Sequence, residues 1–187
     1  MRRLATLFTQ SCQEAKQVRT ITVCAMFGAI AVILGYYSIE IGPYIRIGFA
    51  DIPNRLVDYL FGPVVGGCFG GILDLLKFMM KPSGQFFPGF TLTAITGGIL
   101  YGSMLYKRPF TFRRVLAAKL VVVVICNVLM NTLWMSMLYG KAFMVLLPAR
   151  TLKNMVMWPV DSLLLFTIVS YMERAGVLRR IRSRLAE

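Results

Sequence analysis

Two series of polar and aromatic residues recur at helical spacing in the second half of the sequence. Each stands at positions i, i+4 and i+7: Asn127, Asn131 and Trp134, then Asn154, Trp158 and Asp161. Residues at this spacing share one face of a helix. Amides and a carboxylate can bind the hydrogen-bonding edges of a flat ring that stacks on the tryptophans. The pattern therefore predicts a ligand cavity, although an interhelical hydrogen bond is the alternative for Asn127.

Basic and aromatic residues in the predicted loops extend this chemistry. Arg46, Arg150 and Lys153 could bind an anionic tail of such a ligand. The loop KPSGQFFPGF contains Gln85, Phe87 and Phe90, whose aromatic rings need a neighbouring helix, a lipid interface or a flat ligand to pack on.

An acid and a base also occur together in an apolar context. Asp74 and Lys77 stand at i and i+3, so they could simply pair with one another. An ionisable residue inside a membrane otherwise faces a cavity or a partner. Asp74 is therefore a further candidate for the cavity.

Several kinds of chemistry find no support in the sequence. Histidine is absent, and the four cysteines form no CxxC motif, so neither a metal site nor another cofactor is predicted. No catalytic residues are assigned. Two rival function classes remain open, namely a membrane enzyme that uses aspartate chemistry and a small structural membrane protein.

The elements that hold these residues are predicted from stretches without charge. Apolar residues make up 57% of the 187-residue chain and charged residues 16%, against about 25% in soluble domains. Four segments carry no charge apart from Asp161, and each is close to the roughly 20 residues that cross a membrane. They are residues 20–39, 82–106, 120–140 and 154–172.

The segment between the first two of these is divided by Gly62-Pro63. Because proline suits the first turn of a helix, we expect two short helices, about 50–61 and 63–80, to meet there. Six transmembrane helices then place both termini and the 107–114 loop on one side. That side holds 14 of the 21 basic residues, as expected for the cytoplasm. The net charge of +13 is thus explained by topology, and no nucleic acid is expected.

The predicted protein is therefore an all-α integral membrane protein with six transmembrane helices. Residues 1–19 form a cytoplasmic basic arm, 20–173 the membrane domain and 174–187 a cytoplasmic basic tail. The first outward loop, about 38–49, alternates apolar residues on both sides of Gly42-Pro43, which predicts an extracellular β-hairpin.

Three sequence runs carry a resemblance to a known family. They are LFGPVVGGCFGGILDLLKF at 60–78, FFPGFTLTAITGGILYG at 86–102 and NTLWMSMLYGKAFMVLLPARTLKNMVMWPV at 131–160. In order and spacing they resemble the S component, the substrate-binding membrane subunit, of energy-coupling factor (ECF) vitamin transporters. The folate-specific branch is the most similar.

This resemblance implies a multi-pass plasma-membrane protein that captures folate or a reduced folate from the outer side. Asp74, Asn131 and Trp134 would then hold the pterin ring, and Arg150 and Lys153 the glutamate tail. Other S components bind riboflavin, thiamine or a queuosine precursor, and these ligands remain alternatives.

The resemblance also implies partners in the lipid bilayer and the cytoplasm. They are a transmembrane coupling subunit and two cytoplasmic ATPases. Ala25 and Ala29 match the family's Ala-x-x-x-Ala motif, which contacts the coupling subunit. The sequence has no G-x-x-x-x-G-K-[ST] run, so the energy for uptake would come from another polypeptide.

Overall fold

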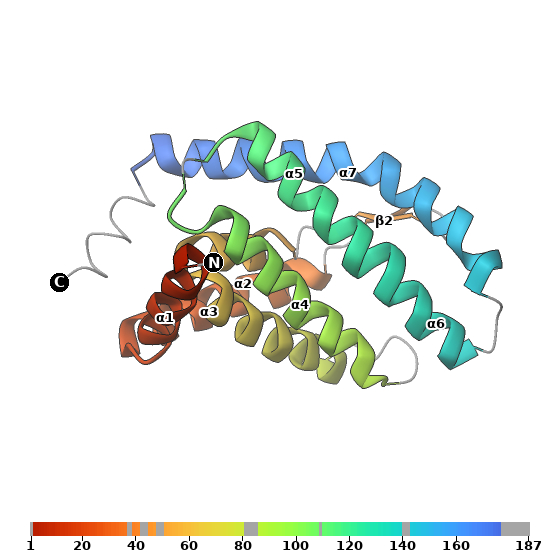
Figure 1. Ribbon diagram of the computed structural model, residues 1–187, viewed down its shortest axis with the longest axis horizontal. Helices are drawn as coiled ribbons and strands as arrows, with labels where there is room; N and C mark the ends of the chain where they lie inside the picture. Colours follow the sequence, from red (N-terminus) through yellow and green to blue (C-terminus); the bar gives the residue numbers. More distant parts are fainter. Residues whose placement is uncertain are drawn as a thin grey trace.

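The protein consists of long helices and one pair of short strands (Figure 1). This is a computed structural model, and it describes residues 2–36, 39–41, 45–47, 51–80, 86–108, 110–139 and 143–176. The helices are α1 (Arg2–Ala15), α2 (Val18–Tyr36), α3 (Asp51–Met80), α4 (Pro88–Leu105), α5 (Phe112–Val122), α6 (Asn131–Tyr139) and α7 (Phe143–Arg174). A π-helical segment, η1 (Val123–Met130), joins α5 to α6 in one continuous rod. The predicted all-helical membrane class is confirmed at this level.

Two short strands lie between α2 and α3. β1 (Ile39–Ile41) pairs antiparallel with β2 (Ile45–Ile47), with Ile39 opposite Ile47 and Glu40 opposite Arg46. The predicted turn at Gly42-Pro43 lies outside the described residues.

Four stretches in the described part of the chain are long and apolar enough to cross a membrane. They are Val18–Gly35, Asp51–Met80, Phe112–Leu138 and Asn154–Arg174. Helix α4 is not among them, although it carries no charge, because its glycines, threonines and proline dilute its hydropathy. It also begins only at Pro88, later than the charge-free segment suggested.

Helix α3 is a sharply bent pair of arms. Gly62 has φ 86° and ψ −168°, a backbone conformation that favours glycine, and Pro63 follows it. Lys77 Nζ lies 3.9 Å from Asp51 Oδ1, whereas a straight helix would separate these two residues by about 39 Å at about 1.5 Å per residue. The arms therefore run antiparallel, and the predicted break at Gly62-Pro63 is confirmed.

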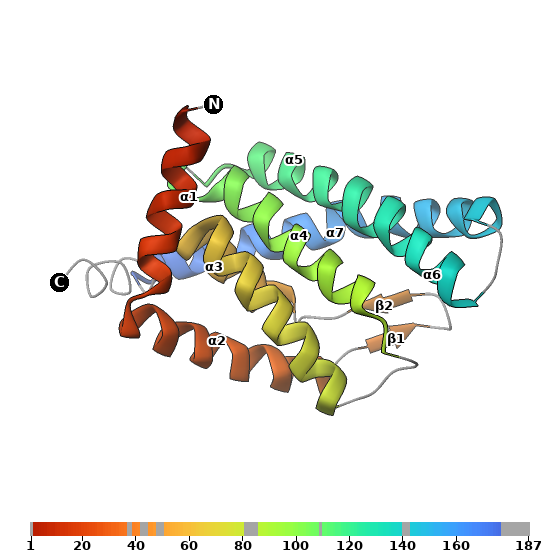
Figure 2. The ribbon, with the colours of Figure 1, turned by 60° about the horizontal axis from the view of Figure 1, so that its bottom comes forward.

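The break in α3 is capped by another helix. Ser11 of α1 donates a hydrogen bond from Oγ to Phe61 O at 2.7 Å, and Ser11 Oγ accepts bonds from Val64 N at 3.1 Å and Val65 N at 3.3 Å. A helix normally receives such a cap from its own N-cap side chain. Gly62 has none, so Ser11 supplies it, and α1 stands across the end of the bundle (Figure 2).

Close backbone contact joins α3 to α4. A Cβ atom added to Gly98 would overlap the carbonyl oxygen of Gly66, and one added to Gly102 would lie 2.6 Å from Pro63 Cα. Such approach is typical of small-residue packing between membrane helices. It holds α4 against the break and the second arm of α3 and fixes one side of the cavity described next.

Candidate binding site

A cavity of about 320 Å³ lies between α3, α4 and the α5–η1–α6 rod. Its volume is within the range of about 300–1,000 Å³ typical of small-molecule sites. The polar and charged residues that line it are Asp51, Asn54, Arg55, Asp74, Lys77, Thr93, Asn127 and Asn131. Apolar contributions include Leu73, Phe90 and Val122.

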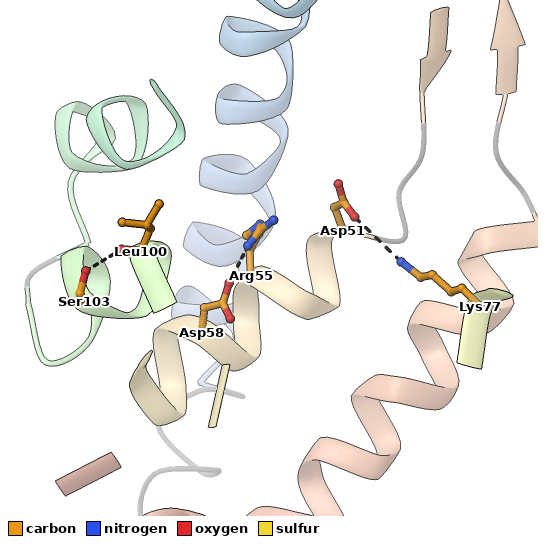
Figure 3. Close-up of polar contacts among 6 residues, drawn as sticks. All are labelled: Asp51, Arg55, Asp58, Lys77, Leu100 and Ser103. Atoms are coloured by element: carbon orange, nitrogen blue, oxygen red, sulfur yellow. Dashed lines mark hydrogen bonds and ion pairs between the residues drawn. The ribbon is translucent and has the colours of Figure 1, made fainter. Parts of the chain in front are cut away.

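Arg55, which lines the cavity, belongs to a buried ion pair on the first arm of α3. Arg55 Nη1 donates to Asp58 Oδ2 at 2.8 Å, and the Arg55 guanidinium lies over the Tyr101 ring, 4.3 Å from its centroid. The Asp58 side chain is fully buried, and that of Arg55 is 14% exposed. Figure 3 shows the two side chains facing one another, with the Asp51–Lys77 pair nearer the start of the arm.

Further polar atoms near this pair have no partner in the described part of the chain. They are Asn54 Oδ1, Arg55 Nε, Asp58 Oδ1 and Tyr101 Oη, and all of them are buried. Buried polar groups are normally hydrogen-bonded. Of these residues Asn54 and Arg55 line the cavity, so this end of it retains hydrogen-bonding capacity that a ligand with polar edges could use.

An aromatic wall stands beside the cavity. Phe87 packs on Phe90 and on Trp134, with ring centroids 6.1 Å and 5.6 Å apart. Trp134 Nε1 donates to Thr93 Oγ1 at 3.0 Å, which fixes the orientation of the indole. The exposed faces of such rings can pack on a flat heterocycle.

Two asparagine side chains are positioned by the π-helical segment η1. Asn127, within η1, donates from Nδ2 to Asn154 Oδ1 of α7 at 3.3 Å. Asn131 follows η1, and its backbone N–H bonds to Cys126 O, five residues back. Segments of π-helix occur frequently at functional sites because they shift which residues share a face. Here Cys126, Asn127 and Asn131 all line the cavity.

Six of the predicted site residues gather in this region. Asp74, Phe90 and Asn131 line the cavity. Phe87 and Trp134 form the aromatic wall, and Asn154 contacts Asn127.

The other four predicted site residues cannot be placed against the cavity. Arg46 lies in β2, and Arg150 and Lys153 lie in α7, but their side chains are outside the described part of the structure. Gln85 lies outside the described residues.

Two arrangements that the sequence left open differ from the contacts of the described residues. Asp74 was an open candidate for a pair with Lys77, but Thr91 Oγ1 donates to Asp74 Oδ2 at 2.8 Å and the antiparallel arms bring Lys77 to Asp51. Trp158 and Asp161 follow Asn154 at helical spacing, but their contacts differ from the contact that Asn154 makes with Asn127. Trp158 Nε1 donates to Leu116 O at 3.0 Å, and Asp161 Oδ2 lies 2.9 Å from Lys119 Nζ, so both join α7 to α5.

Sequence reasoning missed Asn54, Arg55 and Thr93 as lining residues. The i, i+3 spacing of Arg55 and Asp58 is a signal that could have predicted their pairing. What it could not indicate is that α4 and η1 close around Arg55. Thr93 carried no signal in the sequence, because a threonine in an apolar helix commonly bonds its own backbone, as Thr93 also does to Gly89 O at 2.9 Å.

The chain is similar to transporter subunits over most of its length. Residues 19–169 match the family described as "ECF transporter, substrate-specific component". The folate transporter FolT of Clostridium novyi (strain NT) is 36% identical over 139 residues, which cover 74% of this chain and 81% of that protein. The riboflavin transporter RibU of Staphylococcus aureus (strain TCH60) is 24% identical over 163 residues, covering 84% and 83%.

A solved structure supports the same likeness. The crystal structure of FolT bound with folic acid superimposes with a TM-score of 0.73 and 28% sequence identity. The match covers 81% of this chain and 93% of that chain.

Proposed function

The chain belongs to the family of ECF transporter substrate-specific components, and on that premise we propose that it captures folate at the outer face of the plasma membrane for ATP-driven uptake. The observation that carries this proposal is the cavity lined by amides and carboxylates beside an aromatic wall, in a fold shared with a folic acid-bound FolT. A pterin ring has two flat faces for the aromatic residues and a polar edge for the amides.

We assign the pterin ring to Asp74, Asn131 and Trp134. The Asp74 carboxylate can accept hydrogen bonds from both the ring amino group and the adjacent ring N–H, which a neutral amide only partly imitates. Phe87 and Phe90 pack around the ring with Trp134, and Asn154 holds Asn127 in place. Arg46, Arg150 and Lys153 bind the glutamate tail, and Gln85 completes the loop side of the site.

The proposed topology counts six crossings in the described helices. They are α2, the two arms of α3, α4, the α5–η1–α6 rod and α7. An even number places both termini on the same side, and the basic residues make that side the cytoplasm. Residues 1–19 and 174–187 are then cytoplasmic, 20–173 form the membrane domain, and the β1–β2 pair belongs to the extracellular first loop.

A coupling subunit and two ATPases complete the proposed transporter. Ala25 and Ala29 are exposed on α2, one turn apart, while Gly28 turns toward Phe69 of α3. Ile21 and Ile33 continue the stripe, 57% and 59% exposed. A helix of the coupling subunit can approach closely at the two alanines.

A fluorescence titration tests the binding proposal. The chain has two tryptophans, of which Trp134 stands at the cavity and Trp158 is bonded to α5. We expect folate to quench the purified wild type and Trp158→Phe, whereas Trp134→Phe loses the saturable signal. Asp74→Asn should weaken folate binding by about 30-fold to several thousandfold, the cost of truncating a buried charged contact. Stronger binding of riboflavin than of folate would overturn the folate assignment.

An uptake assay tests the coupling surface. We expect Ala25→Trp and Ala29→Trp to abolish folate uptake and co-purification with the coupling module, while the purified variants still bind folate. Leu163→Trp, at an exposed position on α7, is the control and should transport normally. Full uptake by both alanine variants would remove this stripe from the mechanism.

A further inference from the structure

The ion pair of Arg55 and Asp58 is costly for a protein in a membrane. Burying two charges is repaid only by good geometry and further hydrogen bonds, and a buried ion pair is weak evidence for stability. Here Arg55 Nε and Asp58 Oδ1 are both buried without a partner among the described residues. The two side chains therefore do not satisfy all of each other's hydrogen-bonding groups, and a role in stability alone does not account for the pair.

Two glycines, one on α3 and one on α4, leave space around this pair. A Cβ atom added to Gly66 would overlap Asp58 Oδ1, so the second arm of α3 carries no side chain where that carboxylate lies. A Cβ atom added to Gly97 would lie 3.8 Å from Arg55 Nη2 and 3.9 Å from Nη1. Gly97 lines the cavity as well, so no side chain from this position covers that edge of the guanidinium.

Arg55 is held in position, and some of its N–H donors remain available. Asp58 Oδ2 takes a bond from Nη1, and the Tyr101 ring supports one face of the guanidinium. A guanidinium has five N–H donors in a rigid fork, so an edge remains for two adjacent acceptors. Such a fork reads the carbonyl oxygen and neighbouring ring nitrogen of guanine in DNA.

The charge balance favours a neutral ring at this point over an anionic tail. Asp51, Asp58 and Asp74 lie at or directly behind the cavity wall, against Arg55 and Lys77. Among the described residues at this end, the carboxylates therefore outnumber the cations by one, which disfavours a carboxylate of the ligand beside Arg55. A neutral ring with two acceptors on one edge meets the fork without adding charge.

We propose that Arg55 selects the oxo form of the pteridine ring. It donates two hydrogen bonds, one to the ring carbonyl oxygen and one to the adjacent ring nitrogen. Asp58 and Tyr101 are positioning residues that hold the fork. This inference rests on the proposed binding of folate, and it assigns the edge of the ring that Asp74 does not contact.

The test compares three ligands: folic acid, its analogue with the ring carbonyl replaced by an amino group, and the tail-free oxo-pteridine. A bidentate contact of this kind is worth about 1–3 kcal/mol of discrimination, so wild type should prefer folic acid to the amino analogue by about 5- to 150-fold. Arg55→Lys keeps the charge and loses the fork, so it should reduce this preference. The part that remains comes from Asp74, because the amino analogue also lacks the ring N–H that Asp74 accepts.

A paired variant separates binding from folding. Arg55→Met combined with Asp58→Asn leaves no unpaired buried charge, so it should melt close to wild type. It should bind folic acid and the tail-free ring at least about 30-fold more weakly and show a smaller preference for the oxo form than wild type. Asp58→Asn alone should reduce the preference, which a purely structural role would not do. The matched control is Lys119→Met with Asp161→Asn, which removes another ion pair and should keep the preference.

Each remaining outcome contradicts a distinct statement. If wild type binds folic acid but the paired variant keeps the full wild-type preference for folic acid over the amino analogue, the assignment to Arg55 is wrong. If the variants weaken folic acid but not the tail-free ring, Arg55 binds the glutamate tail instead. If wild type binds no pteridine, the proposed function fails and this inference falls with it.

Discussion

Replacing Ser11 by alanine tests whether α1 is part of the fold. The substitution removes the bond to Phe61 O and those from Val64 N and Val65 N at the break in α3. Loss of an N-cap costs about 0.5–2 kcal/mol, and each buried backbone group left without a partner about 1–3 kcal/mol. Because these costs overlap, we expect a loss of about 2–4 kcal/mol in the free energy of unfolding.

The assay is thermal unfolding of the purified protein in detergent. For a chain of this size about 1 kcal/mol shifts the melting temperature by about 2–4 °C, so Ser11→Ala should melt about 4–16 °C below wild type. Ser162→Ala is the matched control, because Ser162 is equally buried but bonds only Trp158 O in its own helix, at 2.7 Å. Equal melting temperatures for the two alanine variants would refute the cap.

Three further outcomes are expected. Burial raises the pKa of Glu14, which accepts a 2.6 Å hydrogen bond from Tyr106 Oη with Lys107 nearby. The contribution of protonated Glu14 to stability is therefore present at acid pH and is lost as the pH rises through the raised pKa. The melting temperature of wild type should fall over this pH window, and a parallel fall in Glu14→Gln would contradict this. Gly98→Ala should cost about 1–3 kcal/mol by overpacking and lower the melting temperature far more than Gly97→Ala, whose new Cβ finds neighbours only at 3.8 Å and beyond. In a variant without native cysteines, Thr111→Cys and Ser183→Cys should react with an impermeant reagent only after cell lysis, and labelling of either in intact cells would rule out the six-crossing topology.

Local signals in the sequence were enough to predict the apolar helices and the break in α3, but not α1, which lies in the predicted basic arm. A long stretch without charged residues indicates a membrane-crossing helix, because burying a charge in lipid is costly. Gly62-Pro63 indicates a break, because the backbone there adopts a conformation that favours glycine. Both can be recognised without knowing what the segment packs against. Phe86 and Phe87 show the limit, because they carry no charge and yet precede the helix that begins at Pro88.

The pairing of side chains could be predicted only in part, because it depends on packing between elements. Lys77 is one turn from Asp74 in sequence, yet the antiparallel arms of α3 bring it to Asp51. Asn154 and Trp158 share a helical spacing, but η1 and α5 offer them different partners. Asp74, Phe90 and Asn131 line the cavity. They were candidates from the sequence because a polar or charged residue inside a membrane faces a cavity or a partner, and because exposed aromatic rings in a loop need a surface to pack on.

The first arm of α3 has a consequence for the path that a ligand would take. From Asp51 to Phe61 it contains 11 residues, or about 16 Å of helix, roughly half the thickness of the hydrocarbon core. Asp58 stands only about one turn from the break. In the proposed orientation, the barrier between the bound ligand and the cytoplasm is therefore thin. It consists of one or two helical turns, the Gly62 break and α1 on the cytoplasmic side of the break. A ligand bound at Arg55 would then lie about 10 Å of helix from the break at Gly62, so the part of the protein that must open for release is this thin barrier.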